Sequence, residues 1–300
     1  MSFESLLKEK AKRLEDIPLS LQTTLEKEQS RVLNEVLKDL SSLDTKDGII
    51  SINNTNLKKV TEISDKLKGI LLSEDYLKAV KNFSSEFSAQ ATLNNKIIKA
   101  GFGEIDNPIA SKAYLDLAKK SAVQSLVGSA VDEQFSKPIT SILETAVVNG
   151  ASFGETIDAL TTAIKGNGKT DSKFLNYARQ ITNDSFAVAD RSFTSIISDA
   201  LDAEWFYYSG TEIDTTRCFC TERVGKYFYY KEIESWGDGK NLGDCNTGGG
   251  AWAGQMKGTN SATIYSYLGG YNCMHSLMPV SEAIVSDSDI ERAKDLGYIE

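Results

Sequence analysis

The residues best suited to chemistry are few, and they lie in the last third of the chain. The 300 residues include four cysteines and a single histidine. Cys218 and Cys220 are separated by one residue, and so are Cys273 and His275. On an extended strand, residues i and i+2 point to the same face, so each pair can present two soft ligands side by side. Together the four residues form a Cys3His set, which suits a tetrahedral structural zinc ion.

Three interpretations of these cysteines stay open on the sequence alone. Structural zinc sites usually have two to four residues between ligands, whereas each pair here has one. Cys245, in a glycine-rich stretch, is a further candidate ligand. Free cysteines behave as small buried hydrophobic residues, so reduced thiols packed among aromatic side chains are the simplest expectation. A disulfide is the third interpretation, although no feature of the sequence indicates export to an oxidising compartment.

The single histidine restricts enzymatic mechanisms. A catalytic Cys/His or Ser/His/Asp arrangement could use only His275. Cys273 would share a strand face with His275 and would not oppose it across a cleft. Glu232 and Glu234 would share a face on a strand, as paired carboxylates that do acid–base chemistry require. In a chain with 42 acidic residues, a solvated acidic face is the simpler interpretation. We therefore expect a protein without enzymatic activity.

Composition and charge exclude two classes of partner. The chain is 41% hydrophobic and 25% charged, which is typical of a soluble globular protein. No apolar run reaches the roughly 18 to 20 residues of a membrane span, and the first residues lack the apolar segment of a secretion signal. The net charge is −9, and residues 101–300 carry 17 basic and 27 acidic residues. Because such a chain binds phosphate backbones poorly, we expect neither a membrane nor a specific nucleic-acid partner.

The first 200 residues have the pattern of a helical bundle. Apolar residues recur at spacings of three and four, which indicates helices that bury one face. Ser152 and Glu155 form a capping box, Gly150 suits a left-handed helix end, and Asn54 or Thr55 can cap another helix. The apolar positions of the first pattern are Leu6, Leu7, Leu14, Ile17, Leu21, Leu25, Val32, Val36 and Leu40.

The sequence changes character near residue 204. Aromatic residues concentrate in 205–230 and favour short strands, and glycines crowd the stretch that follows. We therefore expect an α+β protein, with a mostly α-helical N-terminal two thirds and a small, loop-rich, β-containing C-terminal domain. A break at 101–108 sets a boundary in the helical part. The predicted segments are 1–105 (N-terminal helical region), 106–202 (central helical region), 203–285 (α+β domain) and 286–300 (a tail helix that Ser288 and Glu291 cap).

The C-terminal segment carries a resemblance to a known family. Arg217-Cys218-Phe219-Cys220, followed by Gly225-Lys226-Tyr227-Phe228, is similar to the opening of the bacteriophage Mu F-like minor head protein domain of head morphogenesis. Trp252 follows in the expected order, and the stretch Gly269–Val280, with its Cys-x-His and its proline, looks like the closing signature of that domain. The motif-bearing match spans about 205–282, roughly a quarter of the chain.

The resemblance implies a structural component of a tailed-phage head. Such proteins associate with the portal vertex in a few copies per particle and act in head assembly, DNA packaging or DNA delivery. The implied partners are the portal protein and capsid or scaffold proteins, and the implied locations are the virion head and, during assembly, the host cytoplasm. Two alternatives stay open: an internal virion protein that is ejected with the genome, and a zinc-dependent hydrolase or toxin-type domain that uses His275 and a cysteine.

Overall fold

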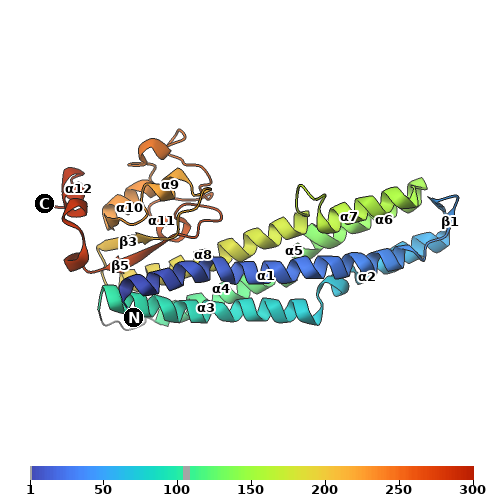
Figure 1. Ribbon diagram of the computed structural model, residues 1–300, viewed down its shortest axis with the longest axis horizontal. Helices are drawn as coiled ribbons and strands as arrows, with labels where there is room; N and C mark the ends of the chain where they lie inside the picture. The colour runs from blue at the N-terminus through green and yellow to red at the C-terminus, as the bar shows by residue number, and fades with distance from the viewer. Residues whose placement is uncertain (1, 104–108) are drawn as a thin grey trace. The chain divides into compact units, whose positions relative to one another are not determined.

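The structure is a computed structural model that describes residues 2–103 and 109–300 (Figure 1). Helices occupy most of the first 200 residues and a small antiparallel sheet follows, which confirms the predicted α+β class. The helices of the first part are α1 (Phe3–Leu40), α2 (Asn54–Leu71), α3 (Glu74–Gly101), α4 (Ile109–Val127), α5 (Ser129–Val131), α6 (Lys137–Asn149), α7 (Phe153–Lys165) and α8 (Lys173–Ala200), with a π-helical turn at Asp132–Ser136. A short hairpin joins β1 (Thr45–Lys46) and β2 (Ile49–Ile50).

α1 is one continuous helix of 38 residues. Its apolar positions follow the predicted spacing, and Leu14, Leu25 and Val36 are 2% exposed or less. The helix continues through Pro18, although a proline in a helix interior removes one backbone hydrogen bond. Burial of the apolar face along the rest of the helix offsets this local loss, because tertiary packing supplies most of the stability of a helix.

The last third of the chain holds a three-stranded antiparallel sheet in the order β4-β3-β5. Trp205, on the central strand, pairs with Tyr229 on one side and with Val280 on the other. The elements of this part are β3 (Trp205–Ser209), α9 (Cys218–Thr221), β4 (Tyr227–Tyr229), α10 (Tyr230–Gly237), α11 (Ile264–Tyr267), β5 (Ser276–Val280) and α12 (Asp287–Asp295), with 3-10 turns at Gly243–Cys245 and Glu282–Ile284.

Local signals locate two helix ends of the first part correctly. The hydroxyl of Ser152 accepts a hydrogen bond from the backbone N–H of Glu155 at 3.4 Å, as the capping box predicts. Gly150 ends α6 with a φ of 60°, in the left-handed region that favours glycine. Both features depend on residues within one turn of each other, which is why the sequence reveals them.

Two other predicted caps are displaced. Asn53 caps α2 in place of Asn54 or Thr55, and Ser286 caps α12 in place of Ser288. In both cases the side-chain oxygen accepts a backbone N–H three residues later. The predicted residues are wrong because they already lie inside the first helical turn, whereas a cap needs the extended backbone that Asn53 and Ser286 have.

Packing divides the chain into two compact units, each assembled from separate stretches. Unit 1 comprises Met1–Pro18, Ser85–Lys119 and Asn183–Glu300, and unit 2 comprises Leu19–Ser84 and Lys120–Thr182. α1, α3, α4 and α8 contribute residues to both units. The predicted boundary near residue 105 lies outside the described residues. The other predicted boundaries divide the chain into continuous segments and stay predictions.

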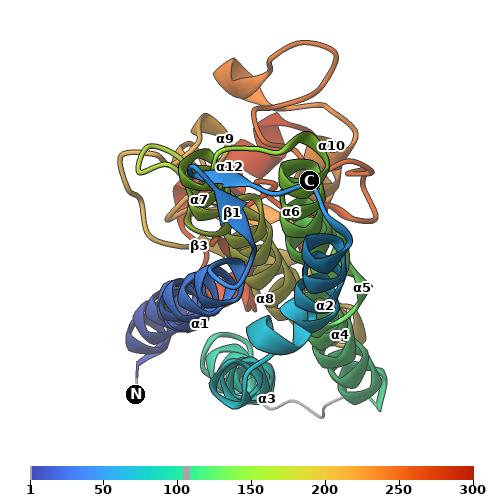
Figure 2. The same ribbon diagram turned by 90° about the vertical axis from the view of Figure 1, so that its right-hand side faces the viewer.

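Unit 2 is built around the α6–α7 hairpin, with α2 beside α6 (Figure 2). Leu143 of α6 and Leu160 of α7 are fully buried. The hydroxyl of Tyr76 donates to the backbone carbonyl of Leu126 at 2.9 Å. Buried Asn56 donates to the carbonyls that precede and follow the β1–β2 hairpin. Within the described residues, none of the helices combines the length and the apolar character that a membrane span requires.

Unit 1 has an aromatic core beside the sheet. Phe219 stacks on Trp252 with ring centroids 4.3 Å apart, and Trp236 meets Phe219 and Phe228 edge to face. The guanidinium carbon of Arg223 lies 4.1 Å from the Phe219 ring centroid and 4.5 Å from that of Trp236. Such contacts add to the hydrophobic stabilisation of a core, and here they hold glycine-rich loops in place.

Candidate metal centre

Cys220, Cys273 and His275 meet in the core of unit 1. The sulfur atoms of Cys220 and Cys273 are 3.7 Å apart, and the sulfur of Cys273 is 3.8 Å from Nδ1 of His275. The three ligand atoms lie within 4.8 Å of one another, and the residues are 3%, 4% and 6% exposed. This group could therefore hold a metal ion, and it contains three of the four predicted ligands.

Four parts of unit 1 position the group. Cys220 lies on α9, whereas Cys273 and His275 lie on the segment that leads into β5. The hydroxyl of Tyr208, on the central strand β3, donates to the sulfur of Cys220 at 3.2 Å. Buried Arg191, on α8, donates to the backbone carbonyls of Cys273 at 2.7 Å and His275 at 3.2 Å. The sheet and α8 thus both hold the segments that carry the ligands.

Two glycines leave room for the group. A Cβ atom on Gly269 would lie 2.4 Å from the sulfur of Cys220 and 2.9 Å from that of Cys273. A Cβ atom on Gly210 would lie 2.3 Å from Cδ2 of His275. Side-chain carbons do not approach other heavy atoms this closely, so the backbone can pass the cluster only where the residue is glycine.

The contact between the two cysteines shifts their pKa values in opposite directions. The hydrogen bond between them, together with burial, raises the pKa of Cys220. The same hydrogen bond lowers the pKa of Cys273 well below its ordinary value, and His275 and the charge of Arg191 act in the same direction. Burial raises the pKa of Tyr208, so its hydroxyl stays a donor. One thiol of the pair therefore loses its proton more readily than the other, and a cysteine binds a metal as the thiolate.

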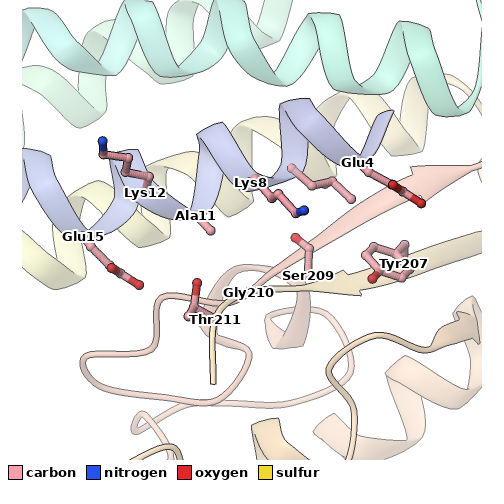
Figure 3. Close-up of a pocket in the computed structure, with 10 residues that line it drawn as sticks. Glu4, Lys8, Ala11, Lys12, Glu15, Tyr207, Ser209, Gly210 and Thr211 are labelled. Carbon is pink, nitrogen blue, oxygen red and sulfur yellow. The ribbon is translucent and has the colours of Figure 1, made fainter. Parts of the chain in front are cut away.

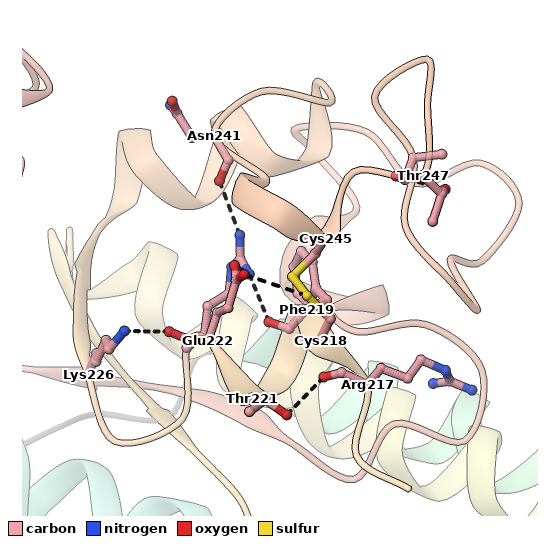
Figure 4. The surroundings of a disulfide bond; sticks show 11 residues. Arg217, Cys218, Phe219, Thr221, Glu222, Lys226, Asn241, Cys245 and Thr247 are labelled. Carbon is pink, nitrogen blue, oxygen red and sulfur yellow. Dashed lines mark hydrogen bonds and ion pairs between the residues drawn. A yellow bond between two sulfur atoms is a disulfide. The ribbon is translucent and has the colours of Figure 1, made fainter.

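Cys218, the fourth predicted ligand, lies apart from this group. Its sulfur is bonded to that of Cys245 in a disulfide (Figure 4). The expectation that Cys218 and Cys220 share a face assumes an extended strand, but both lie on the helical turn α9. Two residues along a helix point about 200° apart. Reduced thiols are therefore found at Cys220 and Cys273, and the disulfide interpretation holds for the other two cysteines.

The acidic residues considered from the sequence do not form a carboxylate pair. Glu232 and Glu234 lie on α10 and not on a strand, so they point in different directions. Buried Glu232 has a carboxylate oxygen 3.3 Å from Nε of Arg292 on α12. Burial raises the pKa of Glu232, and Arg292 partly counteracts this effect. The role of Glu232 is therefore to bind α12 to α10.

A buried ion pair next to the candidate metal centre was missed by the sequence analysis. Lys10 of α1 and Asp190 of α8 are 2.8 Å apart, and their side chains are 1% and 0% exposed. Asp190 also accepts hydrogen bonds from Gln90 at 2.8 Å, Asn94 at 2.9 Å and Ser276 at 2.9 Å. Three helices and β5 thus converge on one carboxylate.

The position of Lys10 within the apolar pattern of α1 is the sequence signal that could have revealed this buried ion pair. Lys10 lies four residues from both Leu6 and Leu14, on the face of α1 that is buried. Burial lowers the pKa of Lys10, and Asp190 counteracts this. Burial opposes ionisation of Asp190, but the charge of Lys10 and the hydrogen bonds outweigh burial and lower the pKa of Asp190. Each charge therefore depends on the other.

A pocket of about 530 Å3 lies between α1 and β3 in unit 1 (Figure 3). Within the described chain its lining combines charges of both signs with hydroxyl groups and holds neither cysteine nor histidine. The polar residues that line it are Glu4, Lys8, Lys12, Glu15, Tyr207, Ser209 and Thr211.

Comparisons of the chain with models of known protein families, with curated proteins and with solved structures found no significant match.

Proposed function

We propose that the chain is a structural protein of a tailed-bacteriophage head that binds at the portal vertex, as its likeness to the Mu F-like minor head domain implies. One observation carries the proposal: residues from the separate segments of the motif pack into a single core. Phe219, Cys220, Phe228, Trp252 and Cys273 belong to one buried cluster and are each 4% exposed or less. Because these residues share one core, the sequence likeness to the Mu F-like domain concerns residues that fold together and not scattered matching positions.

The helical part suits a subunit that binds other subunits. α1, α3 and α8 are 38, 28 and 28 residues long, and long amphipathic helices offer extended faces to protein partners. The charge suits a protein that works beside packaged DNA without adhering to it. Residues 183–300 contain 9 basic and 18 acidic residues, and this excess repels phosphate backbones.

The disulfide of unit 1 favours retention in the head over ejection. Passage through a narrow channel requires a protein to unfold. The bond between Cys218 and Cys245 closes a covalent loop, which restricts the unfolded chain and so resists unfolding.

Quantitative mass spectrometry of purified particles, before and after triggered DNA release, tests this proposal. We expect the chain in a few copies per particle, and we expect the same amount after release. Loss of the chain on release would replace the proposal by the ejected-protein alternative. Absence of the chain from particles would overturn the proposed function.

We also propose that the metal held by Cys220, Cys273 and His275 is zinc with a structural role. Zinc–sulfur bonds of about 2.3 Å place two sulfur ligands of a tetrahedral ion about 3.8 Å apart, and the observed separation is 3.7 Å. Two sulfurs and an imidazole are a donor set that suits zinc. Three protein ligands leave one position for a water molecule. Burial of all three residues keeps substrates away, which favours a structural role over the hydrolase alternative.

Metal analysis of purified protein tests the zinc proposal. We expect equimolar zinc in the wild-type chain and none in Cys273→Ser or His275→Ala. The double variant Cys218→Ser with Cys245→Ser is the matched control, and we expect it to keep its zinc because the disulfide lies outside the metal centre. Equal zinc in all four proteins, or none in the wild type after expression with added zinc, would contradict the proposal.

A further inference from the structure

We propose that docking of the N-terminal helix and binding of a metal at the Cys220–Cys273–His275 group strengthen each other through Lys10. This inference rests on the zinc proposal above. It makes Lys10 a positioning residue for the metal centre, although Lys10 contacts none of the three ligand side chains.

Two consecutive residues of α8 hold the segment that carries two of the ligands. Arg191 donates to the backbone carbonyls of Cys273 and His275, at 2.7 and 3.2 Å. Oδ2 of Asp190 accepts from the hydroxyl of Ser276 at 2.9 Å. The short stretch from Cys273 to Ser276 is therefore fixed to α8 at three points, and its position sets that of the ligands.

Lys10 decides whether Asp190 can hold its place. Nζ of Lys10 lies 2.8 Å from Oδ2 of Asp190, the same oxygen that accepts from Ser276. Lys10 also donates to the sulfur of Met278, on β5, at 3.1 Å. Without Lys10 the buried carboxylate of Asp190 loses the ammonium group that pairs with it, and removal of one partner of a buried pair is strongly destabilising. Asp190 must then move, protonate or admit water, and each change disturbs Ser276 and the ligands before it.

The packing around Lys10 makes the coupling act in the other direction as well. Leu6, one turn before Lys10, belongs to the same buried cluster as Met278 of β5 and Ile197 of α8. A metal that fixes Cys273 and His275 also fixes the start of β5, and so completes the surface on which α1 docks. Coupling between two binding events is reciprocal by thermodynamic necessity. A partner that captured the start of α1 would therefore weaken metal binding, and loss of the metal would release the helix.

Hydrogen exchange of the wild-type chain, with zinc and with a chelator, tests the coupling without any substitution. We expect zinc to slow exchange of the amides of residues 3–18 and to leave the α6–α7 hairpin of unit 2 unchanged. If zinc binds and residues 3–18 do not respond, the coupling is wrong while the zinc proposal stands. If no zinc binds, the zinc proposal fails, and the inference with it.

Zinc affinity of matched variants, measured by competition with a chromogenic chelator, tests the role of Lys10. We expect Lys10→Met to bind zinc about 10 to 100 times more weakly, as is typical when a residue that supports metal ligands is lost. Lys12→Met, two residues along on the exposed face of α1, should bind as the wild type does.

A double variant keeps the test decisive if Lys10→Met folds poorly. Lys10→Met with Asp190→Asn removes both charges, and an amide oxygen can still accept from Ser276. We expect this variant to regain most of the lost zinc affinity, because no charge is stranded. Wild-type affinity in Lys10→Met, or no recovery in a folded double variant, would overturn the inference.

Discussion

Unit 1 and unit 2 share four helices, yet different interactions hold them together. Unit 1 contains all four cysteines, the histidine and all three tryptophans, and it carries the entire net charge of −9. Unit 2 has 16 basic and 16 acidic residues and combines apolar helix faces with uncharged buried hydrogen bonds such as those of Asn56 and Tyr76. The ion pair of unit 1 between Lys10 and Asp190 is buried, whereas Lys68 and Asp132 in unit 2 form a pair whose side chains are 37% and 39% exposed.

The buried ion pair and the disulfide thus both lie in unit 1. Buried polar and covalent contacts demand exact partners, so a single change in unit 1 should cost more than its counterpart in unit 2. The two units can be followed separately, because tryptophan fluorescence reports on unit 1 alone. Far-UV circular dichroism reports on the helices of both units.

Loss of the buried ion pair should have the largest effect. We expect Lys10→Met to lower the free energy of unfolding by about 3 to 5 kcal/mol, because it strands the carboxylate of Asp190. The matched change in unit 2, Lys68→Met, should cost less than about 1 kcal/mol, because its partner Asp132 stays hydrated. Urea denaturation measures both. Equal costs would remove the distinction between the two units.

Loss of the disulfide should come next. Cys218 and Cys245 are 27 positions apart, and closing a loop of this size destabilises the unfolded chain by about 3.5 kcal/mol. We expect the double variant Cys218→Ser with Cys245→Ser to lower the free energy of unfolding, followed by tryptophan fluorescence, by this amount. Reduction of the wild-type disulfide with a thiol reagent is the control and should reproduce the shift. An unchanged transition in both experiments would show that the disulfide adds nothing to unit 1.

Removal of the metal should have a similar or smaller effect, confined to unit 1. A ligand present at 100 times its dissociation constant stabilises a protein by about 2.7 kcal/mol. We therefore expect a chelator to lower the thermal midpoint seen by tryptophan fluorescence and to leave His275→Ala, which lacks a ligand, unaffected. A chelator that destabilised both proteins equally would be acting elsewhere.

Loss of a helix cap in unit 2 should have the smallest effect. Ser152→Ala removes the hydroxyl that accepts from the backbone of Glu155 and should cost about 1 kcal/mol. Ser152→Asp retains an acceptor and is the matched control. Circular dichroism should detect the loss while tryptophan fluorescence does not. A shift of the fluorescence transition in Ser152→Ala would show that the two units unfold together.

The helical part could be predicted to a large extent because its signals are local. The apolar face of α1, the left-handed Gly150 and the cap at Ser152 each depend on residues within one or two turns. Where the prediction was wrong, as at Asn54 and Ser288, the error was one or two residues. Such displacements arise because several neighbouring polar residues can cap, and only the backbone conformation selects one.

The candidate metal centre could be predicted only in part. Cys273 and His275 do lie side by side, with the sulfur of Cys273 3.8 Å from Nδ1 of His275, although both residues precede β5 and neither is on a strand. Cys218 was assigned to the wrong partners, because Cys218 and Cys220 lie on a helical turn. Neighbouring residues could not show this, since the aromatic core of unit 1 around Phe219 determines the turn.

By itself the sequence determined the helix content, the α+β class, the acidic C-terminal region and the small set of residues able to bind a metal. These properties depend on composition and on spacing along one element. The tertiary structure decided which sulfur atoms meet, which two form a bond, and that Lys10, Asp190 and Ser276 share one buried site. Residues so far apart in the chain come together only when the whole core packs, because no local energy term relates them.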